Sequence, residues 1–350
     1  MSDVYLKRIS REELSHHPEV VLAGIERSQL FAGLLKDEFV GCKIHFGEKG
    51  NSSYIDPSWL LATIKALKKI KTRPFLVETN TLYRGERMNA IDHINLASGH
   101  GFSKLNIPII IADGLRGADT LEVESNVKHF KTCFLGQAFR DIDFLLVLSH
   151  LTGHMLTGFG AAIKNIGMGC ASRRGKLAQH CQVSPFIKEA RCIGCHACAK
   201  ECPVNAIERR GEKYFIIKET CIGCAQCVSV CPQGAVDITW SEEYNLLGEK
   251  MVEYAYALTR GRRCGYINFC LYITKECDCM NKEKNSFVKD IGVLFSKDPV
   301  SIDKASIDCL LHQEGSDVLR ATHPAVDYLH HLHYAQEIGL GSLDYRLIEL

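Results

Sequence analysis

Two cysteine runs constrain this chain more than any other feature. Residues 191–240 contain CIGCHACAKECPVNAI and, after a short spacer, CIGCAQCVSVCPQGAV, so each run reads C-x2-C-x2-C-x3-C-P. The short spacings place three thiolates around one corner of a metal cluster. Gly194 and Gly223 let the backbone approach such a cluster, and Pro203 and Pro232 turn the chain away after the fourth cysteine. The doubled run therefore predicts a compact module with two metal centres.

This pattern resembles the ligand run of bacterial two-cluster ferredoxins, in which the fourth cysteine of each run binds the other cluster. The resemblance implies two [4Fe–4S] clusters. One would be held by Cys192, Cys195, Cys198 and Cys231, and the other by Cys221, Cys224, Cys227 and Cys202. Zinc and disulfides are the alternatives, because paired C-x-x-C motifs also form such sites. Zinc sites use four ligands in two pairs, whereas this chain has two runs of four, each followed by proline.

Composition excludes several function classes. The 350 residues suggest two or three domains, and 42 Lys and Arg against 41 Asp and Glu leave a formal net charge of +1. This balance favours neither a nucleic-acid partner nor an anionic membrane. The apolar runs at 107–112 and 144–148 are too short to span a bilayer, and no secretory signal is evident. Seventeen cysteines fit a reducing cytoplasm, and with low-potential clusters they suggest an anaerobic host.

The rest of the chain predicts an α/β fold. We expect residues 1–36 to be mostly helical. Strands are expected at 39–46, 74–77, 107–112, 144–148, 264–273 and 290–294. Helices are expected from Pro57, and at 88–98, 244–258, 300–311 and 325–338. This alternation predicts a mostly parallel-sheet body with an inserted α+β ferredoxin domain. The predicted domains are 1–185 (α/β), 186–240 (ferredoxin) and 241–350 (α/β, completing the body).

Polar residues follow three of the predicted strands. Glu78, Asp113 and His150 each come at or just after a strand end. Because ligands bind beyond the carboxyl ends of strands in open α/β sheets, we expect one crevice there. The alternative is that strand ends are polar simply because loops begin there.

A glycine-rich segment at 149–181 supplies further candidates. We predict catalytic roles in proton delivery and substrate anchoring for His150, His154, Lys164 and His180, oriented by Asp113. These residues would converge on one pocket within electron-transfer reach of a cluster. The alternative for His150 and His154 is that they are hydrogen-bonded polar side chains at a strand end. The alternative for Lys164 is that it lies on a helix surface. A dinucleotide fingerprint is disfavoured, because Ile163 stands where its third glycine belongs.

Three further cysteines are candidates for an additional metal ion. Cys277 and Cys279 are separated by one residue, which allows two thiolates on one metal, and Cys170 could join them. The alternative is ordinary reduced, partly buried thiols.

Most of the chain resembles the uncharacterised Fe–S centre proteins, domain of unknown function family 362, with a ferredoxin insert. The resemblance rests on five segments: 78–93 (ETNTLYRGERMNAIDH), 109–119 (IIIADGLRGAD), 149–180, 276–279 (ECDC) and 290–306 (DIGVLFSKDPVSIDKAS). It implies an iron–sulfur protein but transfers no established activity.

A more distant resemblance is to the nickel-pincer lactate racemases. In that family a histidine lies ten positions before the active-site lysine and another sixteen after it, as His154 and His180 lie about Lys164. The segment ASGHGF would supply a further histidine, His100. The resemblance implies a shared α/β ancestry, and in those enzymes the lysine anchors a covalent cofactor. That family lacks the ferredoxin insert, and a racemase has no net need for electrons.

Together these features predict an iron–sulfur oxidoreductase. Electrons from a redox partner protein, a ferredoxin or an oxidoreductase, would pass through the clusters to a small-molecule substrate or metal site in the α/β crevice. One alternative is a non-catalytic electron carrier or assembly factor, which would need no second polar site. Another is a racemase-like enzyme whose clusters are structural.

Overall fold

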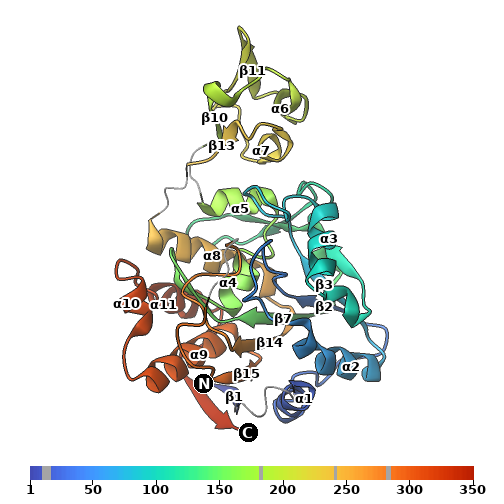
Figure 1. Cartoon of the computed structure of the whole chain (residues 1–350), viewed down its shortest axis with the longest axis vertical. Helices are drawn as coiled ribbons and strands as arrows, with labels where there is room; N and C mark the ends of the chain where they lie inside the picture. The colour runs from blue at the N-terminus through green and yellow to red at the C-terminus, as the bar shows by residue number, and fades with distance from the viewer. Residues whose placement is uncertain (10–16, 181–183, 240–242, 281–284) are drawn as a thin grey trace.

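An eight-stranded sheet forms the centre of the computed structural model, which describes residues 1–9, 17–180, 184–239, 243–280 and 285–350 (Figure 1). The strand order is β16 (Tyr345–Glu349), β1 (Ser2–Arg8), β15 (Gly292–Ser296), β14 (Arg263–Cys270), β7 (Phe144–His150), β2 (Phe39–Lys43), β3 (Arg73–Glu78) and β4 (Ile109–Ile111). The pairs from β14 to β4 are all parallel, and β15 runs antiparallel to both of its neighbours. The predicted α/β class with a mostly parallel sheet is confirmed.

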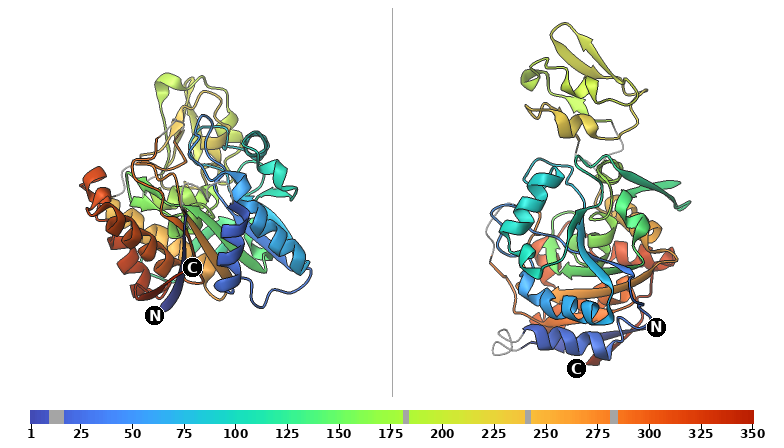
Figure 2. Two further views of the ribbon diagram at one scale, coloured as in Figure 1. Left: turned by 60° about the horizontal axis from the view of Figure 1, so that its bottom comes forward. Right: turned by 90° about the vertical axis from the view of Figure 1, so that its right-hand side faces the viewer.

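Helices cover both faces of this sheet (Figure 2). One core includes Leu146 and Leu148 of β7 and is covered by α1 (His17–Arg27), α2 (Leu61–Ile70) and α3 (Ala90–Gly99). The opposite core includes Leu145 and Val147 and is covered by α4 (Ala162–Gly167), α8 (Tyr244–Thr259), α9 (Pro299–Glu314) and α11 (His330–Glu337). Because both faces are buried, the central strands are apolar at consecutive positions, as in other parallel sheets.

Capping residues define both ends of helix α9. Helix α9 begins where the Asp298 carboxylate accepts the backbone amides of Val300 and Ser301, with Pro299 at the first helical position. It ends at Gly315, whose φ of 65° is left-handed. The sequence predicted this helix at 300–311, close to its observed bounds.

Residues 184–239, here called the module, lie at one end of the body, away from both chain termini (Figure 1). Their elements are β10 (Phe186–Ile187), α6 (Ala197–Lys200), β11 (Ile207–Arg210), β12 (Lys213–Ile216), α7 (Gln226–Val230) and β13 (Val236–Asp237). Strand β10 pairs with β13 and β11 pairs with β12, both antiparallel. The module has its own small apolar core, which Leu82 and Leu177 of the body join. The predicted boundary at 185/186 lies within the described residues, but the one at 240/241 does not.

The structure corrects some predicted elements. Residues 1–36 are not mostly helical, because Ser2–Arg8 forms β1; residues 10–16 lie outside the described part of the chain. Val4 and Leu6 alternate into the core, a period of two that the helical prediction overlooked. The helix expected at 325–338 begins only at His330, and β16 and the hairpin of β5 (Thr120–Glu124) and β6 (Thr132–Gly136) were not predicted. Among the described helices, none has the length and apolar character to cross a membrane.

Candidate functional site

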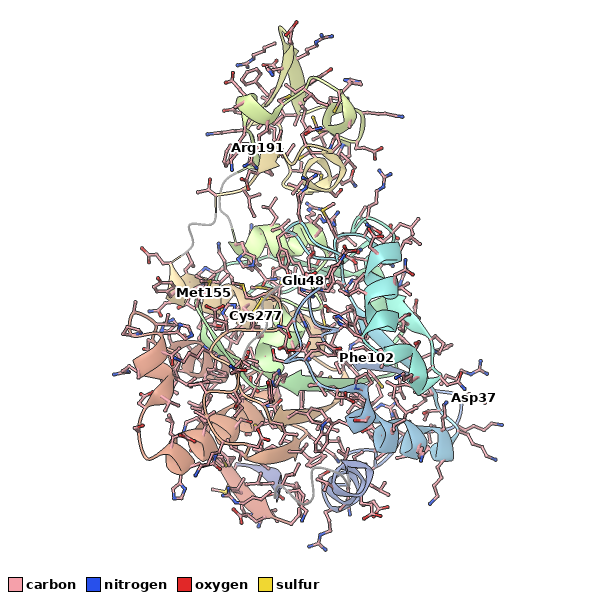
Figure 3. The ribbon with its side chains drawn as sticks, viewed as in Figure 1. Asp37, Glu48, Phe102, Met155, Arg191 and Cys277 are labelled. Carbon is pink, nitrogen blue, oxygen red and sulfur yellow. A yellow bond between two sulfur atoms is a disulfide. The ribbon has the colours of Figure 1, made fainter. Side chains whose placement is uncertain are left out.

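A cavity of about 340 Å³ opens beyond the carboxyl ends of the central strands. His45 follows β2, Glu78 ends β3 and His150 ends β7, and all three line the cavity. Its other walls come from α4, from α5 (Arg173–His180), from the hairpin of β8 (Thr152–His154) and β9 (Gly158–Gly160), and from residues 277–280. Figure 3 shows Glu48, Met155 and Cys277 in the upper half of the body, on the side that faces the module.

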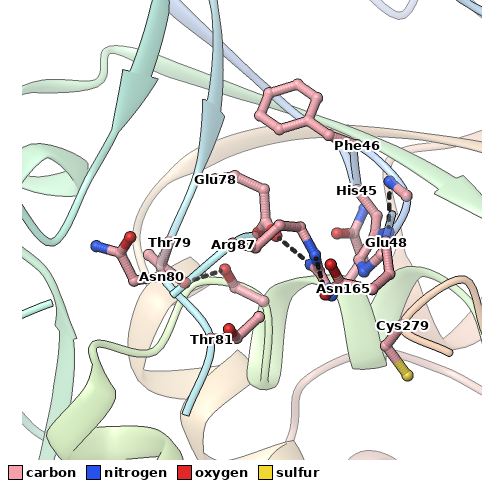
Figure 4. A network of polar contacts seen from close by, with 12 residues as sticks. His45, Phe46, Glu48, Glu78, Thr79, Asn80, Thr81, Arg87, Asn165 and Cys279 are labelled. Atoms are coloured by element: carbon pink, nitrogen blue, oxygen red, sulfur yellow. Dashed lines mark hydrogen bonds and ion pairs between the residues drawn. The ribbon is translucent and has the colours of Figure 1, made fainter. Parts of the chain in front are cut away.

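A buried network of ion pairs forms one side of the cavity (Figure 4). Lys43 Nζ lies 2.6 Å from Glu78 Oε1 and donates to Asn165 Oδ1 at 2.7 Å. Arg87 pairs with Glu48 at 3.2 Å and with Glu78 at 3.5 Å. The side chains of these charged residues are at most 5% exposed. Each cation therefore has a carboxylate partner, and removing one member of a pair would leave a buried charge without its partner.

His154 lines the cavity as a neutral imidazole. Its Nδ1 accepts the backbone amide of Thr157 at 3.1 Å, so its proton resides on Nε2. Burial, together with nearby Lys164 and His180, holds the pKa of His154 well below its usual range. The side chain is therefore equipped to donate a hydrogen bond from Nε2.

Helices α4 and α5 bring Lys164, Lys176 and His180 to the same cavity. Burial lowers the pKa of His180 to about 4, and Lys164 adds to this effect. Lys176 Nζ donates to Thr79 Oγ1 and, at 2.6 Å, to the Ala171 carbonyl. Burial lowers the pKa of Lys176 to about 8, so this ammonium can exchange its proton near neutral pH.

His150 also lines the cavity, but both of its ring nitrogens are occupied. Nδ1 lies 2.8 Å from Asp278 Oδ2, and Nε2 lies 2.8 Å from the Leu271 carbonyl. Burial opposes the charged form, yet Asp278 and Leu271 outweigh it and raise the pKa of His150. Two acceptors on one ring require an imidazolium. The geometry suits a fixed cation better than the proton-delivery role that we predicted.

Asp113 does not line the cavity, which corrects our expectation that it would join the pocket. Its Oδ1 accepts the backbone amide of Asn80 at 2.8 Å and the Asn80 side-chain amide at 2.9 Å. Burial raises the pKa of Asp113 to about 6, although Lys176 opposes this effect. The side chain ties the loop after β4 to the loop after β3. It therefore holds these two loops together and does not face a ligand.

The three-cysteine metal set is not assembled in the structure. Cys277 and Cys279 line the cavity, but their sulfurs are bonded to each other, with a Cα–Cα distance of 5.3 Å. Cys170 is buried elsewhere, with its Sγ 3.8 Å from the Asn165 carbonyl. Within the described ranges, no group of three or more His, Cys, Asp and Glu side chains is placed to hold a single metal ion.

His100, the fourth residue of the racemase-like set, lies outside the cavity wall. Its Nδ1 is 2.7 Å from the Phe46 carbonyl, and its ring stacks on Tyr54 at a centroid distance of 4.4 Å. His154, Lys164 and His180 do line one cavity together. Three of the four residues are therefore brought together and one is not.

The cysteines of the module gather into two quartets, each lining a small cavity of its own. The first quartet is Cys192, Cys195, Cys198 and Cys231, and the second is Cys202, Cys221, Cys224 and Cys227. Backbone amides of Ala206 and Ala235 donate to the sulfurs of Cys202 (3.2 Å) and Cys231 (3.1 Å). Four thiols around one cavity, with amide donors to sulfurs, suit a metal cluster, in which each cysteine binds a different metal atom, rather than a single ion. The fourth cysteine of each run lies with the first three of the other.

Two consecutive residues connect the module to the cavity wall. Arg84 donates to the carbonyls of Cys231 at 2.7 Å and Pro232 at 2.9 Å. Tyr83, which lines the cavity, donates its hydroxyl to the Cys279 carbonyl at 3.3 Å. The loop after β3 therefore touches both a cysteine of the module and the cysteine pair in the body.

Helix α5 makes a second connection. Leu177 packs into the apolar core of the module, while Lys176 and His180 of the same helix line the cavity. An α-helix with its side chains is about 10–12 Å across. Only the width of one helix therefore separates the cavity from the module at this point.

Sequence reasoning missed several residues of the site: Lys43, His45, Glu48, Tyr83, Arg84, Arg87 and Lys176. A signal existed for two of them. Lys43 and His45 interrupt the apolar run from Val40 to Phe46. A charge at the end of a strand that is covered on both faces needs a buried partner, which marks a site.

Known proteins provide a comparison for this fold. The model of the family Domain of unknown function (DUF362) matches residues 40–308. No functionally curated protein matches the chain. Among solved structures, the lactate racemase apoprotein from Thermoanaerobacterium thermosaccharolyticum is similar, with 13% identity and a TM-score of 0.41 over 78% of this chain and 51% of that one.

A crystal structure of a Thermotoga maritima protein is also similar, with 9% identity and a TM-score of 0.44 over 85% of this chain and 59% of that one. The chain thus spans between half and three-fifths of these two proteins. The family match covers well over half of the sequence, and the chain belongs to the DUF362 family.

Proposed function

We propose that this protein is an iron–sulfur oxidoreductase that delivers electrons to a small molecule bound in the body cavity. The observation that carries the proposal is the shared wall formed by α5. Leu177 belongs to the core of the module, whereas Lys176 and His180 line the cavity. A module that only carried electrons to a client enzyme would not need a polar cavity one helix away.

The two quartets are proposed to hold two [4Fe–4S] clusters, with the crossed ligation described above. When bound, such clusters supply one-electron transfer at potentials of roughly −700 to +450 mV. Gly194 and Gly223 adopt a φ of 65°, which allows the backbone to curl around each quartet. The Ala206 and Ala235 amides would donate to cysteine sulfurs in both sites.

The cavity favours an anionic substrate with a reducible, oxygen-bearing group. Lys164 and Lys176 supply positive charge, and Lys176 can also deliver a proton because its pKa is about 8. Neutral His154 would donate its Nε2 proton in a hydrogen bond to a substrate oxygen. The imidazolium of His150 would hold the cavity wall in place through Asp278.

The electron donor is proposed to be a partner protein, a ferredoxin or an oxidoreductase, acting in the cytoplasm. The free thiols of the body, such as Cys42 and Cys133, are buried and fit a reducing compartment. The racemase-like alternative is favoured by one observation, that His154, Lys164 and His180 share a cavity. It leaves both quartets and the α5 connection without a catalytic role.

Anaerobic purification with iron, sulfide, nickel and zinc analysis tests the proposal. We expect about eight irons and eight sulfides per chain, and a reduced-state EPR spectrum of two interacting [4Fe–4S]⁺ centres. About two zinc ions with no iron would refute it. Stoichiometric nickel in the body would instead favour the racemase-like alternative.

A further inference from the structure

The two cysteines of the segment Cys277–Asp278–Cys279 have no part in the function proposed so far. Both cysteines line the cavity, and Cys277 is only 6% exposed. A bonded pair separated by one residue can open and close without moving the backbone far, since its Cα atoms are already 5.3 Å apart. In reducing compartments, disulfides are usually catalytic or redox-sensing rather than structural.

The residue between the two cysteines is firmly held. The Asp278 carboxylate binds His150 at 2.8 Å and accepts the Ser53 hydroxyl at 3.0 Å. Its carbonyl accepts the backbone amide of Glu48, also at 3.0 Å. These three contacts come from segments more than 100 residues away and fix the pair against the end of β7. A structural disulfide would be redundant in a segment that is already anchored this well.

The surroundings suit thiol–disulfide chemistry. Pairing with His150 offsets the negative charge of the Asp278 carboxylate, which would otherwise oppose a thiolate on the cysteines at either side of it. Thiolate is the form that takes part in exchange and in redox cycling. Both cysteines line the cavity in which a small molecule would bind.

The pair is also connected to the module. Tyr83 donates to the Cys279 carbonyl, and the next residue, Arg84, donates to the Cys231 carbonyl. A path of two hydrogen bonds and two adjacent residues therefore runs from a cysteine of the first quartet to the cysteine pair. No other pair of cysteines in the described ranges is bonded.

We infer that Cys277 and Cys279 are a redox-active pair that joins one-electron delivery to two-electron chemistry in the cavity. The inference rests on the proposed function for its source of electrons. Two equivalents of a reduced one-electron carrier protein supply two electrons, and two protons enter from solvent. The S–S bond breaks and two thiols form. The thiols then pass two electrons and two protons to the anionic acceptor, and the S–S bond forms again.

The test counts electrons and thiols in the full-length, cluster-loaded protein. Protein oxidised anaerobically with ferricyanide is titrated with dithionite, denatured in a maleimide, and analysed by peptide mass spectrometry. We expect no maleimide on Cys277 and Cys279 before titration and one on each after about four electrons per chain, two of them taken up by the clusters. Cys309, a buried free thiol of the body, should react in both states and serves as the internal control.

Matched variants make the result decisive. In Cys277→Ser, Cys279 should react with maleimide before and after titration, and the chain should take up two fewer electrons. Two maleimides on the wild-type pair before titration would overturn the inference, as would an unreacted pair after full bleaching of the cluster absorbance. If the protein holds no iron, the proposed function fails separately. A dithiothreitol titration with the same mass readout then shows whether the pair cycles.

Discussion

The module and the body cavity assemble their functional residues in opposite ways. Each cysteine quartet takes three members from seven consecutive residues, and the module around it has a small apolar core. The cavity instead collects Lys43, Glu78, Lys164 and Cys277 from segments spread over more than 200 residues, between two large cores. Small domains with little core depend on metal for stability, whereas a large core stabilises itself. The comparison teaches that the module should need its cofactor to fold and the body should not.

The largest expected effect follows from removing iron. Anaerobic chelation should abolish protection from hydrogen exchange across residues 184–239, because the metal-free thiols no longer hold the short strands and helices together. The strands β2, β7 and β14 of the body should stay protected. Exchange followed by mass spectrometry measures both regions in one sample. Equal protection of the module with and without iron would contradict the claim that the module needs its cofactor to fold.

A second prediction sharpens the geometry within the module. Cys231→Ala should damage the cluster held by Cys192, Cys195 and Cys198, because all four cysteines line one cavity. These three thiols should become reactive to maleimide in the native protein, and up to about four irons should be lost. Cys202→Ala should expose the other three instead. Exposure of Cys221, Cys224 and Cys227 in the Cys231→Ala variant would mean that the ligation is not crossed.

A third prediction tests the self-sufficiency of the body. Glu78→Gln removes the carboxylate shared by Lys43 and Arg87 and should cost on the order of 3–5 kcal/mol in free energy of unfolding. The control is Glu86→Gln, which breaks an exposed pair with Lys49 and should cost less than about 1 kcal/mol. Denaturant unfolding of the body provides the measurement, and iron content should not change in either variant. Equal costs would show that the buried network is not what stabilises the cavity.

The smallest expected effect concerns pH. Burial lowers the pKa of Lys176 to about 8, so between pH 8 and about 10.5 the unfolded chain binds more protons than the folded one at this residue. The wild type should therefore gain stability relative to Lys176→Met as the pH rises through this window, by roughly 2–3 kcal/mol. The exposed-residue variant Lys104→Met is the control and should follow the wild type. A difference that stays constant with pH would contradict the low pKa of Lys176.

The same contrast explains what the sequence could reveal. The cysteine runs lie within the module, and their resemblance to two-cluster ferredoxins implied the two sets of cysteines that line its two small cavities. The mostly parallel sheet followed from apolar runs, and α9 followed from the helical pattern at 300–311 after Pro299. Strand β1 was not predicted because its alternation of buried and exposed residues is short. Its partners β15 and β16 also lie at the other end of the chain.

The cavity could be predicted only in outline. His154, Lys164 and His180 share one glycine-rich segment and were found together. The residues that set the protonation states of the histidines were not found, because they contact the histidines only after folding. Thr157 sets the tautomer of His154, and Asp278 holds His150 as a cation. Asp113 was misplaced because a position after a strand does not tell which way the side chain turns.

The pairing of β1 with β15 and β16 also has a consequence for the order of events during synthesis. Strand β1 is made before the other strands of the sheet, yet both of its neighbours come after residue 290. At about 5–20 residues per second, β1 waits roughly 15–60 s on the ribosome before the sheet can close around it. The module is complete well before then. Metal loading can therefore take place on a nascent chain whose body is still open, and a delay in loading would leave unpaired strand edges exposed to aggregation.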